Sequence, residues 1–141
     1  MKTRGSCFCG AIAYEAEIDE QRIGVCHCRD CQIFSGSAFR TAAALSPADF
    51  EITKGSPKTF DKTADSGNVR RMVFCGDCGT HICSLPPDPA TEGAFVSLRI
   101  ATCDDFARLK PRGELFCRSK VSWLPAIEGA IAFDAEPPPR R

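Results

Sequence analysis

The sequence has no long apolar run and no surplus of charge of either sign. No stretch of its 141 residues approaches the roughly 20 apolar residues of a membrane-spanning helix. The opening MKTRGSCFCG lacks the apolar segment of about 7–15 residues that a secretion signal carries. The 18 basic residues are balanced by 18 acidic ones, whereas nucleic-acid-binding domains are strongly basic. We therefore expect a cytoplasmic protein with neither a membrane nor a nucleic acid as its partner.

Aromatic hydroxyl and indole groups are also scarce. The sequence contains ten Phe but only one Tyr and one Trp. This predicts an aromatic core with few polar groups that need hydrogen-bond partners. A chain of this length suits a single domain, which we place at residues 1–134. The end of the chain, 135–141, is rich in Pro and Arg and is expected to be a disordered tail.

Short runs of alternating or apolar residues predict strands. In GAIAYEAEI (10–18), one side of the expected strand carries Ile12, Tyr14, Ala16 and Ile18. Further strands are expected within 37–45, 50–55, 58–63, 69–75, 81–85 and 94–101, which are separated by Gly, Pro, Ser, Asp and Asn. Helix signals are weak and confined to 29–34 and to one turn after Ser46. The pattern predicts an all-β sandwich or folded sheet with little helix.

Cysteine, by contrast, is abundant. Ten cysteines require an explanation in disulfides, metal binding or redox chemistry. In a reducing cytoplasm, dense cysteine patterns indicate metal ligands more readily than disulfides. Seven of the ten fall into three tight motifs: Cys7-x-Cys9, Cys26-x-Cys28-x2-Cys31 and Cys75-x2-Cys78.

Two of these motifs have the spacing of a structural zinc site. Residues i and i+2 of an extended chain lie on one face, so Cys7 and Cys9 can reach the same metal ion. In CGDCG (75–79) the glycines permit a tight turn with positive φ, as in zinc knuckles. A structural zinc takes four protein ligands, so the two pairs can supply one complete site.

The remaining motif then offers Cys26, Cys28 and Cys31 to a second ion. Catalytic zinc sites have three protein ligands and leave one position to water or substrate. We therefore predict a catalytic-type zinc here, and two zinc ions per chain in total. Zinc held by three thiolates favours an incoming thiol, which points to sulfur chemistry.

Other interpretations of the cysteines stay open at this point. The seven could form a disulfide scaffold or a redox switch, or could divide between two metals in another way. The three-cysteine motif could hold a second structural zinc closed by a fourth ligand, for which the candidates are His27, Cys83 and Cys117. The isolated Cys83, Cys103 and Cys117 are otherwise expected to be small buried apolar residues, and His81 an ordinary strand residue. A zinc-ribbon nucleic-acid binder would find support only in the basic stretches 69–71 and 140–141.

The order and spacing of the motifs resemble the glutathione-dependent formaldehyde-activating enzyme family. The likeness is carried by GSCFCGAIAYE (5–15), VCHCRDCQIFSGSAF (25–39) and VFCGDCGTHI (73–82). It continues through FEITKGSPKTF (50–60), Asp104 and Asp105, Pro111 and 122–124. The resemblance implies a β-tent fold with two zinc ions. It assigns the structural zinc to Cys7, Cys9, Cys75 and Cys78 and the catalytic zinc to Cys26, Cys28 and Cys31.

The resemblance also implies a reaction, the reversible joining of glutathione and formaldehyde into S-hydroxymethylglutathione by a carbon–sulfur lyase. The expected partners are then a small thiol such as glutathione and a small aldehyde. His27 is the imidazole nearest in sequence to the catalytic motif and is our candidate for proton transfer. Candidate partners for the two carboxylates of glutathione are Arg29, Arg40, Arg70, Arg71 and Arg99. The alternative function is a non-catalytic zinc-binding structural or interaction module.

Overall fold

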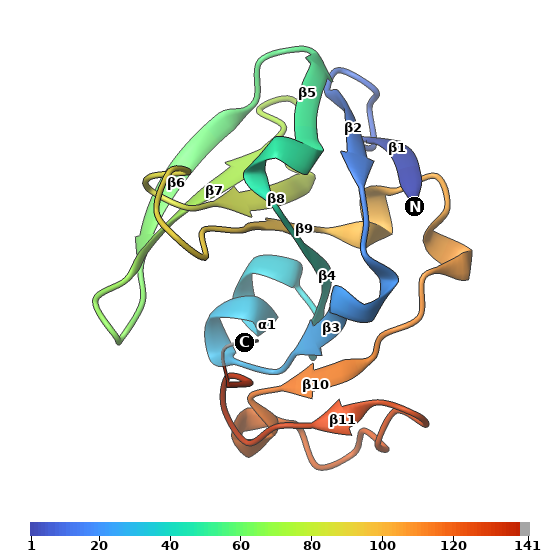
Figure 1. Cartoon of the computed structure of the whole chain (residues 1–141), viewed down its shortest axis with the longest axis vertical. Helices are drawn as coiled ribbons and strands as arrows, with labels where there is room; N and C mark the ends of the chain where they lie inside the picture. The colour runs from blue at the N-terminus through green and yellow to red at the C-terminus, as the bar shows by residue number, and fades with distance from the viewer. Residues whose placement is uncertain (139–141) are drawn as a thin grey trace.

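The chain folds into two β-sheets that enclose the main hydrophobic core. The computed structural model describes residues 1–138. The smaller sheet is antiparallel and has the order β1 (Lys2–Ser6), β2 (Ala13–Glu17), β5 (Phe50–Lys54). The larger sheet has the order β11 (Ile131–Ala132), β10 (Gly113–Leu115), β3 (Ile23–Cys26), β4 (Arg40–Leu45), β9 (Val96–Leu98), β8 (His81–Leu85), β7 (Val69–Phe74), β6 (Lys58–Thr63). This mainly β architecture confirms the expected fold class and is consistent with a β-tent (Figure 1).

Helical segments are short and occupy the connections. The helix α1 (Arg29–Ser35) follows β3 directly and lies beside β4 (Figure 1). The other segments are single turns of 3-10 helix: η1 (Glu20–Arg22), η2 (Pro47–Asp49), η3 (Ile100–Thr102), η4 (Phe106–Arg108) and η5 (Cys117–Ser119). Within residues 1–138, no helix has the length and apolar content needed to cross a membrane.

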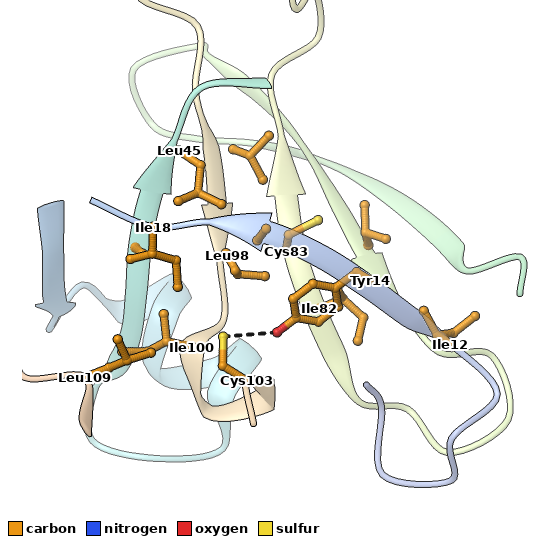
Figure 2. Packing of buried hydrophobic residues seen from close by; sticks show 14 of the residues in the cluster. Ile12, Tyr14, Ile18, Leu45, Ile82, Cys83, Leu98, Ile100, Cys103 and Leu109 are labelled. Carbon is orange, nitrogen blue, oxygen red and sulfur yellow. Dashed lines mark hydrogen bonds between the residues drawn. The ribbon is translucent and has the colours of Figure 1, made fainter. Parts of the chain in front are cut away.

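The core lies between the two sheets. The alternating side chains Ile12, Tyr14, Ala16 and Ile18 are all buried, as their spacing predicts. They pack against Cys83 on β8 and Leu98 on β9, which are fully buried (Figure 2). The Tyr14 hydroxyl lies 2.7 Å from the Thr102 hydroxyl and 3.2 Å from the Cys103 sulfur. Cys83 and Cys103 are thus the buried residues that the sequence predicts, while Cys117 is only partly buried.

Every run predicted to form a strand contains one in the structure. The turn after Ser46 is η2, and the Ser46 hydroxyl accepts a hydrogen bond from the Ala48 amide as a helix cap. Four strands have no clear signal in the sequence: β1, β3, β10 and β11. β1 reads KTRGS and is nearly all polar or small, while β10 and β11 span two or three residues and depend on distant partners.

The parallel pairing of β10 with β3 brings the last part of the chain to the three-cysteine motif. Glu114 pairs in register with Val25, and Leu115 with Cys26. The chain then continues through η5 to β11, which pairs in parallel with the other edge of β10. Of the predicted tail 135–141, residues 139–141 lie outside the described residues. The carbonyl of Ala135 accepts a hydrogen bond of 3.1 Å from the Phe116 amide.

Candidate functional site

The structure brings together two cysteine pairs that lie far apart in the sequence. Cys7 and Cys9 lie in the turn between β1 and β2, and Cys75 and Cys78 in the turn between β7 and β8. All four sulfurs lie within 4.8 Å of one another. The Cys7–Cys9 and Cys9–Cys75 sulfur separations are 3.6 and 3.8 Å. Four thiolates placed about 2.3 Å from one tetrahedral zinc would be about 3.8 Å apart, so this group fits a zinc ion.

Each turn of the four-cysteine group directs hydrogen-bond donors at sulfur. The Ile12 amide donates to the Cys7 sulfur at 3.2 Å. The Thr80 hydroxyl lies 3.2 Å from the Cys78 sulfur, and hydrogen bonds from this hydroxyl and from the Thr80 backbone lower the pKa of Cys78 to about 5. Gly79 has a φ of +77°, which lets the chain turn back within the motif. Donors of this kind stabilise thiolates and thus favour metal binding.

The second cysteine group lies where β3 passes into α1. Cys26 ends β3, Cys28 is the N-cap residue of α1, and Cys31 lies in the first turn of the helix. The three sulfurs lie within 4.8 Å of one another. The Cys28 sulfur accepts a hydrogen bond of 3.3 Å from the Cys31 amide. Cys26 and Cys31 are buried and Cys28 is partly exposed, so the group faces solvent mainly through Cys28.

Charge around these three sulfurs is unevenly distributed. Hydrogen bonds with Cys28 and Cys31 raise the pKa of Cys26 above its usual range. Hydrogen bonds from Cys26 and Cys28 lower the pKa of Cys31, and so does Arg40, whose Nε donates to the Cys31 sulfur at 3.1 Å. Three thiolates this close repel one another, and a divalent cation bound between them removes that penalty. The donor set therefore fits a thiophilic metal ion such as zinc.

The three candidates for a fourth ligand lie elsewhere. Cys83 is fully buried in the main core. His27 and Cys117 form a different group with Glu114, in which the three ligand atoms lie within 4.8 Å of one another. Among residues 1–138, no further Cys, His, Asp or Glu joins Cys26, Cys28 and Cys31 in one group.

His27 is held in a buried polar cluster. Its exposed fraction is 1%, and its Nε2 lies 3.1 Å from Oε1 of Glu114. The same oxygen accepts a hydrogen bond of 2.8 Å from Lys120 Nζ, and Oε2 accepts one of 3.0 Å from the Ile127 amide. Burial by itself would raise the pKa of Glu114, but Lys120, the Ile127 amide and His27 together hold it below its usual value. The Lys120 ammonium supplies positive charge to this carboxylate, which needs no metal ion to balance it.

This cluster ties the three-cysteine motif to the last part of the chain. Glu114 and Lys120 were not predicted from the sequence, because each is a single charged residue without a motif and meets His27 only through the pairing of β3 with β10. Nδ1 of His27 is buried and has no hydrogen-bond partner among the described residues. A role for His27 in proton transfer stays a prediction.

The five candidate arginines divide into two sets. Arg29 and Arg71 are exposed, and Arg71 pairs with Asp61 at 2.9 Å. Arg40, Arg70 and Arg99 lie together along the larger sheet, and Arg40 contacts the three-cysteine group through its Nε, 3.1 Å from the Cys31 sulfur. His81 begins β8, as expected, and its ring is stacked on Phe74 with centroids 5.8 Å apart. Burial and the charge of Arg99 lower the pKa of His81.

A surface groove of about 540 Å³ runs along the smaller sheet. Its lining comes from β1, β2, β5 and their neighbours and includes Asp104 and Asp105 but no cysteine. The candidate site is therefore defined by the cysteine geometry and not by this groove.

Comparison with known proteins tests the family resemblance. Residues 2–119 match the family model described as glutathione-dependent formaldehyde-activating enzyme. The chain belongs to this family. Two further proteins are similar to the chain. Over 76 residues the chain is 32% identical to an uncharacterised lyase of Schizosaccharomyces pombe, a match that covers 54% of this chain and 52% of the yeast protein. The chain thus matches about half the length of that relative.

A solved structure shares the fold. The crystal structure of a Rhodobacter sphaeroides protein superposes with a TM-score of 0.56 and 19% identity, covering 72% of this chain and 87% of the other. At this level of identity the similarity concerns the fold alone.

Proposed function

We propose that this chain is a zinc-dependent carbon–sulfur lyase that makes and breaks the adduct of a small thiol and a small aldehyde. Family membership and the yeast relative, which is named a lyase, support the reaction class. The family name supports glutathione and formaldehyde as the substrates. The observation that carries the proposal is the group of Cys26, Cys28 and Cys31, whose sulfurs lie within 4.8 Å of one another without a fourth protein ligand among residues 1–138.

In this proposal the two cysteine groups have different tasks. Cys7, Cys9, Cys75 and Cys78 would surround a structural zinc completely. Cys26, Cys28 and Cys31 would hold a second zinc that has room for one more ligand. When bound there, zinc would supply a Lewis acid and a preference for sulfur in its thiolate form.

The reaction itself needs no redox partner. In the direction of synthesis, the thiol sulfur forms a bond to the carbonyl carbon, and the electron pair of the C=O π bond moves to the oxygen. The proton lost from sulfur ends on that oxygen, so atoms and charges balance. The protein has to orient the two reactants and to move one proton.

We assign the transfer of this proton to His27. If its Nε2–H donates to Glu114, which lies 3.1 Å away, then Nδ1 carries a lone pair and not a proton. Nδ1 is buried and has no hydrogen-bond partner among residues 1–138, so the proposed proton transfer requires that the substrate or a water molecule reach the buried ring. Lys120 and the Ile127 amide hold the Glu114 carboxylate in place, which fixes the tautomer of the imidazole.

The test is a measurement of exchange at equilibrium, because glutathione and formaldehyde also combine without a catalyst. Carbon-13-labelled formaldehyde and glutathione are mixed, and the rate of exchange between free aldehyde and adduct is followed by NMR. We expect the rate to rise in proportion to added protein, to fall to the uncatalysed rate after treatment with a chelator, and to recover when zinc is restored. Protein that carries about two zinc ions per chain and does not accelerate exchange would favour the non-catalytic zinc module instead.

A further inference from the structure

Three arginine side chains converge on the larger sheet, on the face opposite the main core. Arg40 begins β4, Arg70 lies on β7, and Arg99 follows β9 as the N-cap residue of η3. Between them lie Ser84 on β8 and Ser97 on β9, which are paired in register. Successive residues of a strand point to opposite faces, and the neighbours of these serines, Cys83 and Leu98, belong to the core. The serines and the arginines that they contact therefore lie on the other face.

Each of the three guanidinium groups donates hydrogen bonds to one of these two serines. Nη1 of Arg40 and Nη1 of Arg99 donate to the same Ser97 hydroxyl oxygen, at 2.8 and 3.0 Å. Nη2 of Arg70 donates to the carbonyl and to the hydroxyl of Ser84, at 3.0 and 3.1 Å. Both serines are buried, with exposed fractions of 5% and 6%. The guanidinium groups are thus fixed in position by hydrogen bonds to neutral oxygens.

No carboxylate among the described residues balances this positive charge, and the nearest anionic group is the Cys31 thiolate beside Arg40. None of the ion pairs within residues 1–138 includes Arg40, Arg70 or Arg99. Arg99 is only 9% exposed, and burial together with the charge of Arg40 lowers its pKa to about 9. Buried charges are normally paired, and here three like charges adjoin without a carboxylate. An anion bound among them would remove the repulsion.

The arginine cluster adjoins the three-cysteine group. Arg40 belongs to both, because its Nε donates to the Cys31 sulfur at 3.1 Å while its Nη1 bonds Ser97. Arg70 lies at the other end of the cluster and is stacked over the ring of Phe95. The distance from Cζ of Arg70 to the ring centroid is 4.4 Å. A molecule with its sulfur at the three-cysteine group would therefore have positive charge beside it on this side.

Resting on the proposed function, we infer that Arg40, Arg70 and Arg99 form an anion-binding subsite that receives a carboxylate of the thiol substrate. Guanidinium groups bind carboxylates through paired N–H donors, and glutathione carries two carboxylates. The subsite would select acidic thiols over neutral ones of similar size. It would also place the anion so that the thiol sulfur lies beside Cys31.

The test uses the full chain loaded with zinc and a ligand that cannot react, S-methylglutathione. Its binding is measured by titration calorimetry and compared with that of its diethyl ester, in which both carboxylates are masked. We expect the ester to bind at least about 10-fold more weakly to the wild-type protein, because a hydrogen bond to a charged group is lost. This comparison needs no variant. An ester that binds as well as the acid would overturn the inference.

The matched variants are Arg70→Met and Arg108→Met, which remove the same charge at different places. Arg108 is 74% exposed and pairs with Asp105. With circular dichroism and zinc content unchanged, Arg70→Met should weaken S-methylglutathione binding at least about 10-fold and Arg108→Met should not. Equal behaviour of the two variants would overturn the inference. The inference would also be overturned if inorganic phosphate competed with S-methylglutathione and bound more tightly.

The outcomes separate the subsite from the lyase. Acid-selective binding that depends on Arg70, without catalysed exchange, would support the subsite and refute the proposed function. Catalysed exchange at equal rates with glutathione and with neutral 2-mercaptoethanol, unaffected by Arg70→Met, would refute the subsite alone.

Discussion

Cys75→Ala is expected to abolish cooperative folding of the chain or to lower its melting temperature by more than about 10 °C. Cys75 is buried, and its sulfur lies 3.8 Å from that of Cys9, although 66 residues separate the two in the sequence. Zinc held by four thiolates contributes about 10–16 kcal/mol of apparent binding free energy in small zinc domains, and removal of one ligand forfeits much of it. Elemental analysis should show zinc falling from about two to about one per chain, and thermal circular dichroism should show the loss of stability.

Cys103→Ala is the matched control for this change. Cys103 is also buried, with an exposed fraction of 5%, but it belongs to neither cysteine group, and its sulfur contacts the Tyr14 hydroxyl. The change should cost about 1 kcal/mol and leave zinc content unaltered. The structural-zinc assignment would be wrong if Cys75→Ala kept both its zinc and the wild-type melting temperature.

Cys28→Ser is expected to reduce catalysed exchange of the thiol–aldehyde adduct by at least about 100-fold while the fold is retained. The four-cysteine group stays intact in this variant. A serine oxygen at position 28 can still accept the Cys31 amide hydrogen bond that caps α1. Zinc content should fall to about one per chain. The rate is compared with that of Cys103→Ala at equal protein concentration, and normal turnover in Cys28→Ser would exclude the three-cysteine group from catalysis.

The two cysteine groups could be predicted from the sequence because their geometry is mostly local. In C-x-C and C-x2-C the spacing alone places two sulfurs near each other, and CGDCG contains the glycine that its turn requires. Four of the seven cysteines are enough for one structural zinc site, which leaves three for a second site. Which pair joins which is a matter of tertiary structure, and the structure brings Cys7 and Cys9 to Cys75 and Cys78 as the resemblance implied.

The surroundings of the sulfurs could not be predicted in the same way. Glu114 and Lys120 meet His27 only because β10 pairs in parallel with β3. Arg40, Arg70 and Arg99 are scattered along the sequence, and five arginines were equally plausible partners for an anion. The alignment of β4, β9, β8 and β7 selects three of them. Contacts across strands distant in sequence are set by register, and a single sequence gives no direct signal of register.

We propose that Cys26, Cys28 and Cys31 hold a metal ion with one exchangeable position. The most direct test replaces zinc by cobalt(II), whose visible absorption reports the ligands and geometry of the metal. The absorption is recorded as glutathione is added without oxygen. We predict that the thiol changes the spectrum of about one of the two cobalt ions per chain and changes nothing in Cys28→Ser. A wild-type spectrum that stays the same at saturating glutathione would contradict the claim, because it would mean that neither metal ion has a position for a thiol.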